Sequence, residues 1–181
     1  MVLSVGSNLG DRLGPLQGCV QAIGGLPDTD VLAISPVYET DPVGGPDQPD
    51  YLNAVLIAAT CLGPLDLLAA TQRIEAGFGR VRGSGTERFG PRTLDIDIIS
   101  YAEEVSGDPV LTLPHPRAHE RAFVLAPWHD IDAGASVPGR GPVADLLAGL
   151  GRRGVRRQPG MVLRPPRPRE PSGPGTPAET S

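Results

Sequence analysis

Two aspartates separated by one isoleucine, Asp95 and Asp97, are the feature that most constrains this 181-residue chain. In a β-strand, the two carboxylates share one face, while Leu94, Ile96 and Ile98 share the other. A rise of about 3.3 Å per residue places the aspartates about 6–7 Å apart along the strand. Unpaired carboxylates on a core strand repel each other and resist desolvation. The pattern therefore predicts a bound cation, and magnesium carrying phosphate fits it best.

Arginines in front of the aspartates favour this interpretation over a strand with a solvated acidic face. Arg80, Arg82, Arg88 and Arg92 lie in residues 79–92, a stretch that also contains Gly, Ser and Thr. Guanidinium groups suit phosphate oxygens, just as carboxylates suit hard cations. Loops of this length without secondary structure are uncommon unless they are functional or disordered. We therefore predict that this loop folds over a polyphosphate.

Charge and composition narrow the possible functions. All 16 basic residues are arginines, which excludes a Walker A loop and the strand lysine of protein kinases. Residues 1–151 carry a net charge of −10, so we expect no nucleic-acid binding by this body. We see neither a signal peptide nor an apolar run of about 20 residues. A cytoplasmic location without membrane contact is expected, and the two cysteines predict neither a disulfide nor a metal site.

Hydrophobic periodicity predicts strands and helices in the order β-α-β-β-α-β. The strands are expected at residues 2–6, 31–38, 51–60 and 93–101. The helices are expected at residues 11–25 and 64–78, with shorter elements within 110–113, 114–125 and 143–150. This order predicts an α+β fold with a ferredoxin-like core, in which an antiparallel sheet carries its helices on one face. Residues 1–150 should form one domain, and the Pro- and Arg-rich residues 151–181 a disordered tail.

Polar side chains on two of these elements are further candidates. Gln72 and Glu75 lie one helical turn apart and can reach a nucleotide, although solvent-exposed helix residues give the same pattern. Tyr51 and Asn53 share one strand face and suit a flat, hydrogen-bonding heterocycle. A core edge with one satisfied amide explains that pair equally well.

His115 lies between Pro114 and Pro116, whose rings restrict its backbone. Together with Arg121, it is a candidate phosphate contact. His119 follows four residues later, but Pro116 argues against a helical metal-binding pair of histidines.

The chain resembles the 6-hydroxymethyl-7,8-dihydropterin pyrophosphokinases, which are enzymes of folate biosynthesis. The resemblance covers residues 2 to about 150 and follows the family's order. It is carried by residues 5–12, 35–40, 47–54, 72–75, 79–82, 88–98, 113–116 and 121–124. The run Gly-Pro-Arg-Thr-Leu-Asp-Ile-Asp at residues 90–97 is the most specific of these. The resemblance implies a magnesium-dependent diphosphokinase that transfers pyrophosphate from ATP to the pterin's hydroxymethyl group and releases AMP.

The same resemblance implies roles for single residues. Asp95 and Asp97 would bind two magnesium ions and act in catalysis with Arg80 and Arg92. Nucleotide contacts are implied for Gln72, Glu75, Arg82, Ile98, His115 and Arg121. Pterin contacts are implied for Thr40, Val43, Tyr51, Asn53, Phe89 and Phe123. ATP and the pterin are the expected partners, and the chain is expected to be a monomer.

Three other functions stay open at the level of the sequence. A non-catalytic relative would bind ATP and pterin without releasing AMP. An RNA-binding ferredoxin-like module is disfavoured, because the strands lack a stacked-aromatic signature and the body is acidic. A magnesium-dependent phosphoesterase using Asp95 and Asp97 would release phosphate from ATP in the absence of pterin.

Overall fold

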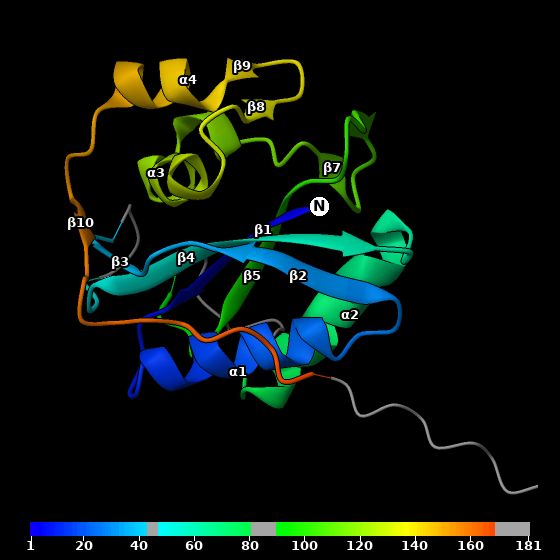
Figure 1. Ribbon diagram of the computed structural model, residues 1–181. Coiled ribbons are helices and arrows are strands. Elements are labelled where there is room, and N and C mark those ends of the chain that lie inside the picture. Colours follow the sequence, from blue (N-terminus) through cyan, green and yellow to red (C-terminus); the bar gives the residue numbers. More distant parts are fainter. Residues whose placement is uncertain (43–46, 81–89, 169–181) are drawn as a thin grey trace, which may run out of the picture.

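The computed structural model describes residues 1–42, 47–80 and 90–168, and its centre is an antiparallel sheet (Figure 1). The six strands of this sheet are β1 (Val2–Ser7), β2 (Thr29–Ile34), β3 (Tyr38–Thr40), β4 (Tyr51–Thr60), β5 (Asp95–Ser100) and β10 (Val155–Arg157). Their spatial order is β10-β3-β4-β1-β5, and β2 pairs with the second half of β4. Two short pairs lie apart from the sheet: β6 (Ser106–Gly107) with β7 (Thr112–Leu113), and β8 (Ser136–Val137) with β9 (Gly141–Pro142).

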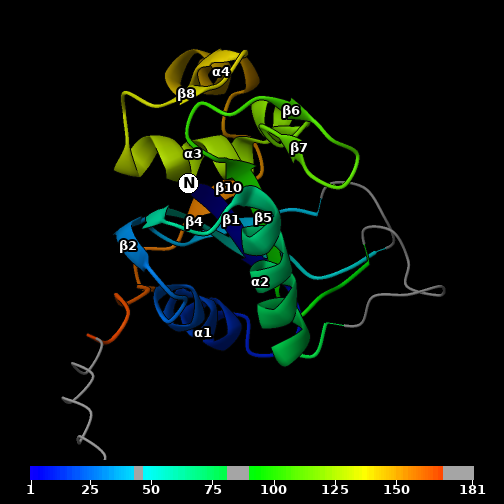
Figure 2. The ribbon, with the colours of Figure 1, turned by 90° about the vertical axis from the view of Figure 1, so that its right-hand side faces the viewer.

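Helices lie on both faces of the sheet (Figures 1 and 2). One face carries α1 (Leu13–Gly24) and α2 (Pro64–Gly77), which completes the expected ferredoxin-like α+β core. The opposite face carries α3 (Ala122–Ile131), and α4 (Val143–Leu150) packs on α3. A 3₁₀ helix, Ala118–Glu120, leads into α3. The two core helices lie on one face as predicted, and α3 and α4 add a further layer on the opposite face. Among the described residues, no helix has the length and apolar character needed to cross a bilayer.

Two apolar cores, one on each side of the sheet, follow from the alternation of side chains along the strands. The α1/α2 side buries Leu94, Ile96 and Ile98 of the β5 region, whereas Ile99 belongs to the core on the α3 side. This confirms the alternation predicted for the aspartate strand. Asp95 and Asp97 therefore share the α3 face of the sheet, where the apolar core ends.

The strand expected at residues 31–38 is divided into β2 and β3. Pro36 lies between them and has no amide proton to donate to a neighbouring strand. Ser35 maintains the connection to β4, because its amide donates to the Val55 carbonyl at 2.9 Å and its Oγ accepts from the Val55 amide at 2.8 Å. The break lets β2 and β3 pair with different halves of β4.

Residues 151–168, here called the C-terminal strap, fold against the body, in contrast to the expected disordered tail. The strap contains β10, which pairs with β3, and it buries Leu163 in the α1/α2 core. Although the strap is rich in Pro and Arg, Met161 also packs against this core, and Val155 packs against the core on the α3 side. The folded body therefore extends past residue 150 to residue 168, and residues 169–181 of the expected tail lie outside the described part.

The contact between α1 and α2 gives a matched test of helix packing. An added Cβ at Gly18 would overlap the Phe78 ring, whereas one at Gly77 would meet open space. We expect Gly18→Ala to lower the free energy of unfolding by about 1–3 kcal/mol through overpacking. Gly77→Ala should leave it unchanged or raise it by up to about 1 kcal/mol. Urea unfolding measures both, and equal effects of the two substitutions would contradict this account.

Candidate active site

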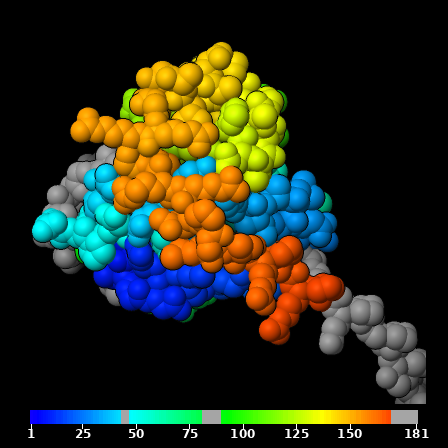
Figure 3. Space-filling view, turned by 60° about the vertical axis from the view of Figure 1, so that its left-hand side comes forward, coloured from blue at the N-terminus to red at the C-terminus, as the bar shows by residue number. Residues whose placement is uncertain are grey.

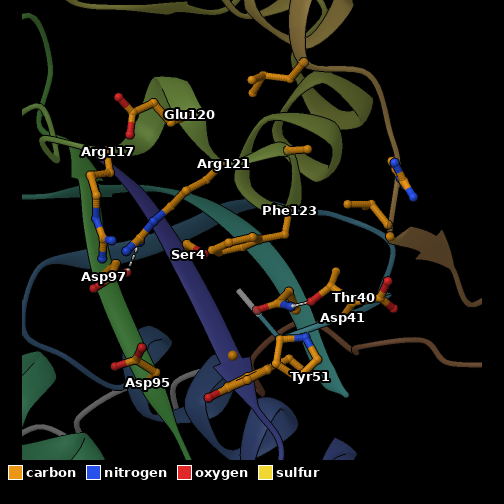
Figure 4. A pocket seen from close by; sticks show the side chains of 18 of the residues that line it. Ser4, Thr40, Asp41, Tyr51, Asp95, Asp97, Arg117, Glu120, Arg121 and Phe123 are labelled. Carbon is orange, nitrogen blue, oxygen red and sulfur yellow. Dashed lines mark hydrogen bonds and ion pairs between the residues drawn. The ribbon is translucent and has the colours of Figure 1, made fainter. Parts of the chain in front are cut away.

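A cavity of about 530 Å³ opens on the α3 face of the sheet, beyond the end of the apolar core (Figure 4). Its floor comes from β1, β4 and β5, and its walls come from the segment after β3, the 3₁₀ helix, the start of α3 and the strap. Both aspartates of β5 line it, as does Arg92, which precedes that strand. The aspartate pair predicted from the sequence thus opens onto one cavity.

Asp95 is held between two arginines. Arg92 donates from Nη1 to Asp95 Oδ2 at 2.7 Å, and Arg80 donates from Nη1 to Asp95 Oδ1. Burial acts to raise the pKa of the Asp95 carboxyl, but the charges of Arg92 and Arg80 outweigh burial and hold this pKa below its ordinary value. Asp95 is therefore a carboxylate at neutral pH, with its charge balanced by two guanidinium groups.

Asp97 has a separate set of partners. Arg121 donates from Nη1 to Asp97 Oδ2 at 2.6 Å, and His115 Nε2 lies 3.9 Å from the same oxygen. His115 Nδ1 accepts a hydrogen bond from the Arg117 amide at 3.1 Å, which places the ring proton on Nε2, toward Asp97. Burial lowers the pKa of His115, against the opposing effect of the Asp97 charge. A neutral histidine thus directs an N–H toward Asp97.

Glu75 supports the aspartate strand from beneath and does not open onto the cavity. Its side chain is 1% exposed, and its Oε1 accepts from the Ile96 amide of β5 at 2.9 Å. The same oxygen lies 3.2 Å from Nη1 of Arg80, which also donates to the Leu94 carbonyl. Because β5 is the outermost strand on its side of the sheet, Glu75 supplies the acceptor that a further strand would have offered.

The other end of the cavity is built from amide and hydroxyl groups. Asn53 is buried and donates from Nδ2 to Thr40 Oγ1 at 2.6 Å. Gly6 of β1 lies opposite Asn53, and an added Cβ at Gly6 would lie 2.7 Å from Asn53 Oδ1. Glycine at this position therefore leaves room for the amide. The Tyr51 hydroxyl donates to Gln48 Oε1 at 3.0 Å.

Phe123 separates the two ends of the cavity. It lies in the first turn of α3, and its ring points into the cavity between Asp97 on one side and Thr40 and Tyr51 on the other (Figure 4). The guanidinium carbon of Arg121 lies 5.4 Å from the centre of this ring. The cavity therefore has an arginine-rich end for anions and a more neutral end, with one aromatic face between them.

Comparisons with known proteins identify the family. A family model described as 7,8-dihydro-6-hydroxymethylpterin-pyrophosphokinase (HPPK) matches residues 2–133. The 2-amino-4-hydroxy-6-hydroxymethyldihydropteridine pyrophosphokinase of Pseudomonas aeruginosa is 41% identical over 158 residues, which cover 87% of this chain and 96% of that protein. The protein of the same name from Mycobacterium tuberculosis is 46% identical over 164 residues, covering 83% of each. The chain belongs to this pyrophosphokinase family.

Solved structures agree with the pyrophosphokinase fold. Wild-type Plasmodium falciparum HPPK-DHPS, solved with pterin and p-hydroxybenzoate, matches with a TM-score of 0.61 at 13% sequence identity. The match covers 82% of this chain and 41% of that chain, so this chain spans about two fifths of the solved protein. At this identity the likeness concerns the fold alone.

Most residues predicted for a pyrophosphokinase site come together around the cavity. Those that line it are Thr40, Tyr51, Asn53, Arg92, Asp95, Asp97, Arg121 and Phe123. Arg80 and His115 lie behind them and contact the aspartates. Three predicted residues, Val43, Arg82 and Phe89, lie outside the described residues.

Three other predicted nucleotide contacts are placed differently. Glu75 is buried beneath β5, whereas Gln72 is exposed on α2, so the two do not share an environment. Ile98 is buried in the α1/α2 core, so its side chain faces away from the cavity. In each case the backbone register and helix packing set the environment, which residue type alone does not reveal.

The cavity also includes residues that sequence reasoning missed. Arg117 and Glu120 line it beside Arg121, and Arg117 points toward Asp97 (Figure 4). Gly6 lines the floor opposite Asn53. Arg117 lies only two residues from His115, a predicted phosphate contact, so its positive charge could have indicated a place in the site. Gly6 lies in one of the runs that carry the family resemblance, but its role depends on which strand lies opposite it.

Proposed function

We propose that this chain transfers the terminal pyrophosphoryl group of ATP to the hydroxymethyl oxygen of 6-hydroxymethyl-7,8-dihydropterin, giving AMP and the pterin diphosphate. Membership of the pyrophosphokinase family indicates this reaction. The observation that assigns this reaction to particular residues is that one cavity has two chemically different ends. Asp95, Asp97 and their arginines lie at one end, and the Thr40–Asn53 pair lies at the other.

The arginine-rich end suits a magnesium-bound triphosphate. Asp95 and Asp97 are part-exposed carboxylates on one strand face, which are the hard oxygen ligands that Mg²⁺ takes together with phosphate oxygens and water. Within the described ranges, no cluster of three or more His, Cys, Asp or Glu surrounds them. Phosphate oxygens and water would supply the remaining ligands. We propose that the two aspartates hold two magnesium ions, which supply charge neutralisation for ATP when bound.

Arginines at this end have a second task beside balancing the aspartates. Arg92 and Arg121 line the cavity, and their planar guanidinium groups suit phosphate oxygens. In the protein alone they bond Asp95 and Asp97 at 2.7 and 2.6 Å. These ion pairs hold the guanidinium groups at the cavity wall before the nucleotide arrives. Such preorganised charge stabilises the phosphoryl group as charge develops on it.

The neutral end suits the pterin. Its flat ring fits against Phe123, and the buried Asn53 amide, oriented by its hydrogen bond to Thr40, matches the ring's donor and acceptor edge. The hydroxymethyl oxygen then attacks the β-phosphorus of ATP. The bond from this phosphorus to the bridging α-phosphate oxygen breaks, AMP leaves, and the hydroxyl proton passes to solvent. The protein's main contribution is to align these groups and neutralise their charge.

The nucleotide product tests the proposed reaction. With ATP, magnesium and the pterin alcohol, we expect equal amounts of AMP and pterin diphosphate, measured by ion-pair chromatography. Chelation by EDTA should stop product formation, and added magnesium should restore it. ADP as the product would replace this proposal with simple phosphoryl transfer. Phosphate released without the pterin would favour a phosphoesterase, and binding of both substrates without any product would favour a non-catalytic relative.

A further inference from the structure

The C-terminal strap runs along the edge of the sheet that carries the neutral end of the cavity. Val155 lies opposite Thr40, and Arg157 lies opposite Tyr38. The Asp41 amide donates to the Gly154 carbonyl at 3.1 Å, which extends this contact past the strand. Gly154 and Val155 line the cavity. The strap is thus part of the pocket wall, although it lies outside the stretch matched by the family model, residues 2–133.

Contacts with α1 fix the far end of the strap. Gln17 donates to the Arg164 carbonyl at 3.0 Å and accepts from the Arg164 amide at 2.7 Å. Gln21 makes the same two-way contact, donating to the Pro165 carbonyl at 3.1 Å and accepting from the Arg167 amide at 2.9 Å. Figure 3 shows the strap crossing the surface from the α4 end to α1. Buried Leu163 secures the same stretch from within.

Arg156, the middle residue of β10, joins two carboxylates that lie 115 and 106 positions earlier in the chain. Its Nη1 lies 2.6 Å from Asp41 Oδ1, and its Nη2 lies 2.7 Å from Asp50 Oδ2. Asp41 follows Thr40, and Asp50 precedes Tyr51, so both carboxylates adjoin residues at the neutral end of the cavity. Residues 43–46, which connect them, lie outside the described part.

Two further contacts restrict the position of the junction formed by Arg156, Asp41 and Asp50. Arg12 donates from Nη1 to the Asp50 carbonyl at 2.8 Å and pairs with Glu39 at 2.9 Å. Gly154 has a φ of +71°, and an added Cβ there would lie 2.8 Å from Asp41 Oδ2. Glycine therefore provides both the left-handed backbone and the close approach to Asp41. The junction is a network and not a single surface ion pair.

We propose that Arg156 is a positioning residue for the pterin end of the pocket, and that the strap holds it there. Resting on the proposed function, this assigns to the strap control of pterin affinity. Arg156 fixes Asp41 and Asp50, and through them the chain that places Thr40 and Tyr51. Arg156 pairs with Asp41 and Asp50, whereas Asp95 and Asp97 of β5 pair with Arg92 and Arg121. Its effect should therefore fall on the pterin and not on ATP.

Arg156→Gln, Arg157→Gln and wild type should be compared. Arg157 is the matched control, because it is the next residue of β10, has an exposed side chain and pairs only distantly with Asp130, at 4.0 Å. For Arg156→Gln we expect the KM and dissociation constant of the pterin alcohol to rise about three- to tenfold. The KM for ATP and kcat should stay within about twofold, and Arg157→Gln should resemble wild type in all constants.

A double substitution tests the route of the effect. Asp50→Asn should also weaken pterin binding, and Asp50→Asn combined with Arg156→Gln should weaken it no more than the stronger single change. An unchanged pterin constant in Arg156→Gln overturns the proposal, as does an equal rise in the KM for ATP. Failure of the proposed reaction is recognised separately, since wild type would then form no AMP while the binding constants still report on the strap.

Discussion

Replacing Asp97 by asparagine should reduce the rate of AMP formation at least about 10³-fold at saturating magnesium, because a ligand charge facing the phosphates is lost. Asparagine keeps the size of the side chain and leaves Arg121, now 2.6 Å from Asp97 Oδ2, without its ionic partner. The unbalanced positive charge of Arg121 then repels the magnesium that ATP brings into the site. Quenched-flow or steady-state assays of AMP release measure the loss.

Glu120→Gln is the matched control for Asp97→Asn. Glu120 also lines the cavity and carries one negative charge, but it lies on the 3₁₀ helix and is largely exposed. Its substitution should change the rate by less than about fivefold, since an exposed charge is screened by solvent. Near-normal turnover by Asp97→Asn with ample magnesium would refute the assignment of this aspartate to the metal. Unchanged thermal unfolding of both variants would confine any difference to the site.

Replacing Glu75 by alanine should lower the free energy of unfolding by about 3 kcal/mol. The Ile96 amide, which donates to Glu75 Oε1 at 2.9 Å in a buried environment, would lose this acceptor. Arg80 would lose its ion pair with Glu75 while staying next to Asp95. Because Ile96 lies between the two aspartates, we also expect a lower kcat. Denaturant unfolding and AMP release measure the two effects.

Two controls separate the buried hydrogen bond from general changes in α2. Gln72→Ala, on the exposed side of the same helix, should alter stability by less than about 0.5 kcal/mol. Glu75→Gln retains an oxygen acceptor for the Ile96 amide and should cost less than Glu75→Ala. If Glu75→Ala were as stable as Gln72→Ala, the proposed support of β5 would be wrong.

Local periodicity predicted the aspartate strand well, because a period of two fixes which side chains share a face whatever the strand's neighbours are. The same reasoning found the order of the ferredoxin-like core. Phe123 was assigned to the site through the family resemblance, whereas Arg121 was already a candidate phosphate contact together with His115, and the structure places both at the cavity. Their distance from Asp97 in the chain gave no local signal for this placement.

Tertiary contacts account for what the sequence did not predict. Glu75 has the appearance of a solvent-facing helix residue until β5 is placed over it. The composition of the strap predicts disorder, yet the pairing of β10 with β3, buried Leu163 and the side-chain amides of Gln17 and Gln21 hold it against the body. Each of these contacts joins segments far apart in the chain, and a sliding window over the sequence contains only one of the two partners.

Pairing between β3 and β10 also has a consequence for biosynthesis of the protein. Arg156 and Asp41 are separated by 115 positions. During translation, β3 therefore cannot pair with β10 until the ribosome has added the residues between them. At about 5–20 residues per second, this delay is about 6–23 seconds. During that interval the outer edge of β3 is open to other binding partners, including chaperones. Pterin affinity should accordingly be among the last properties that a nascent chain acquires.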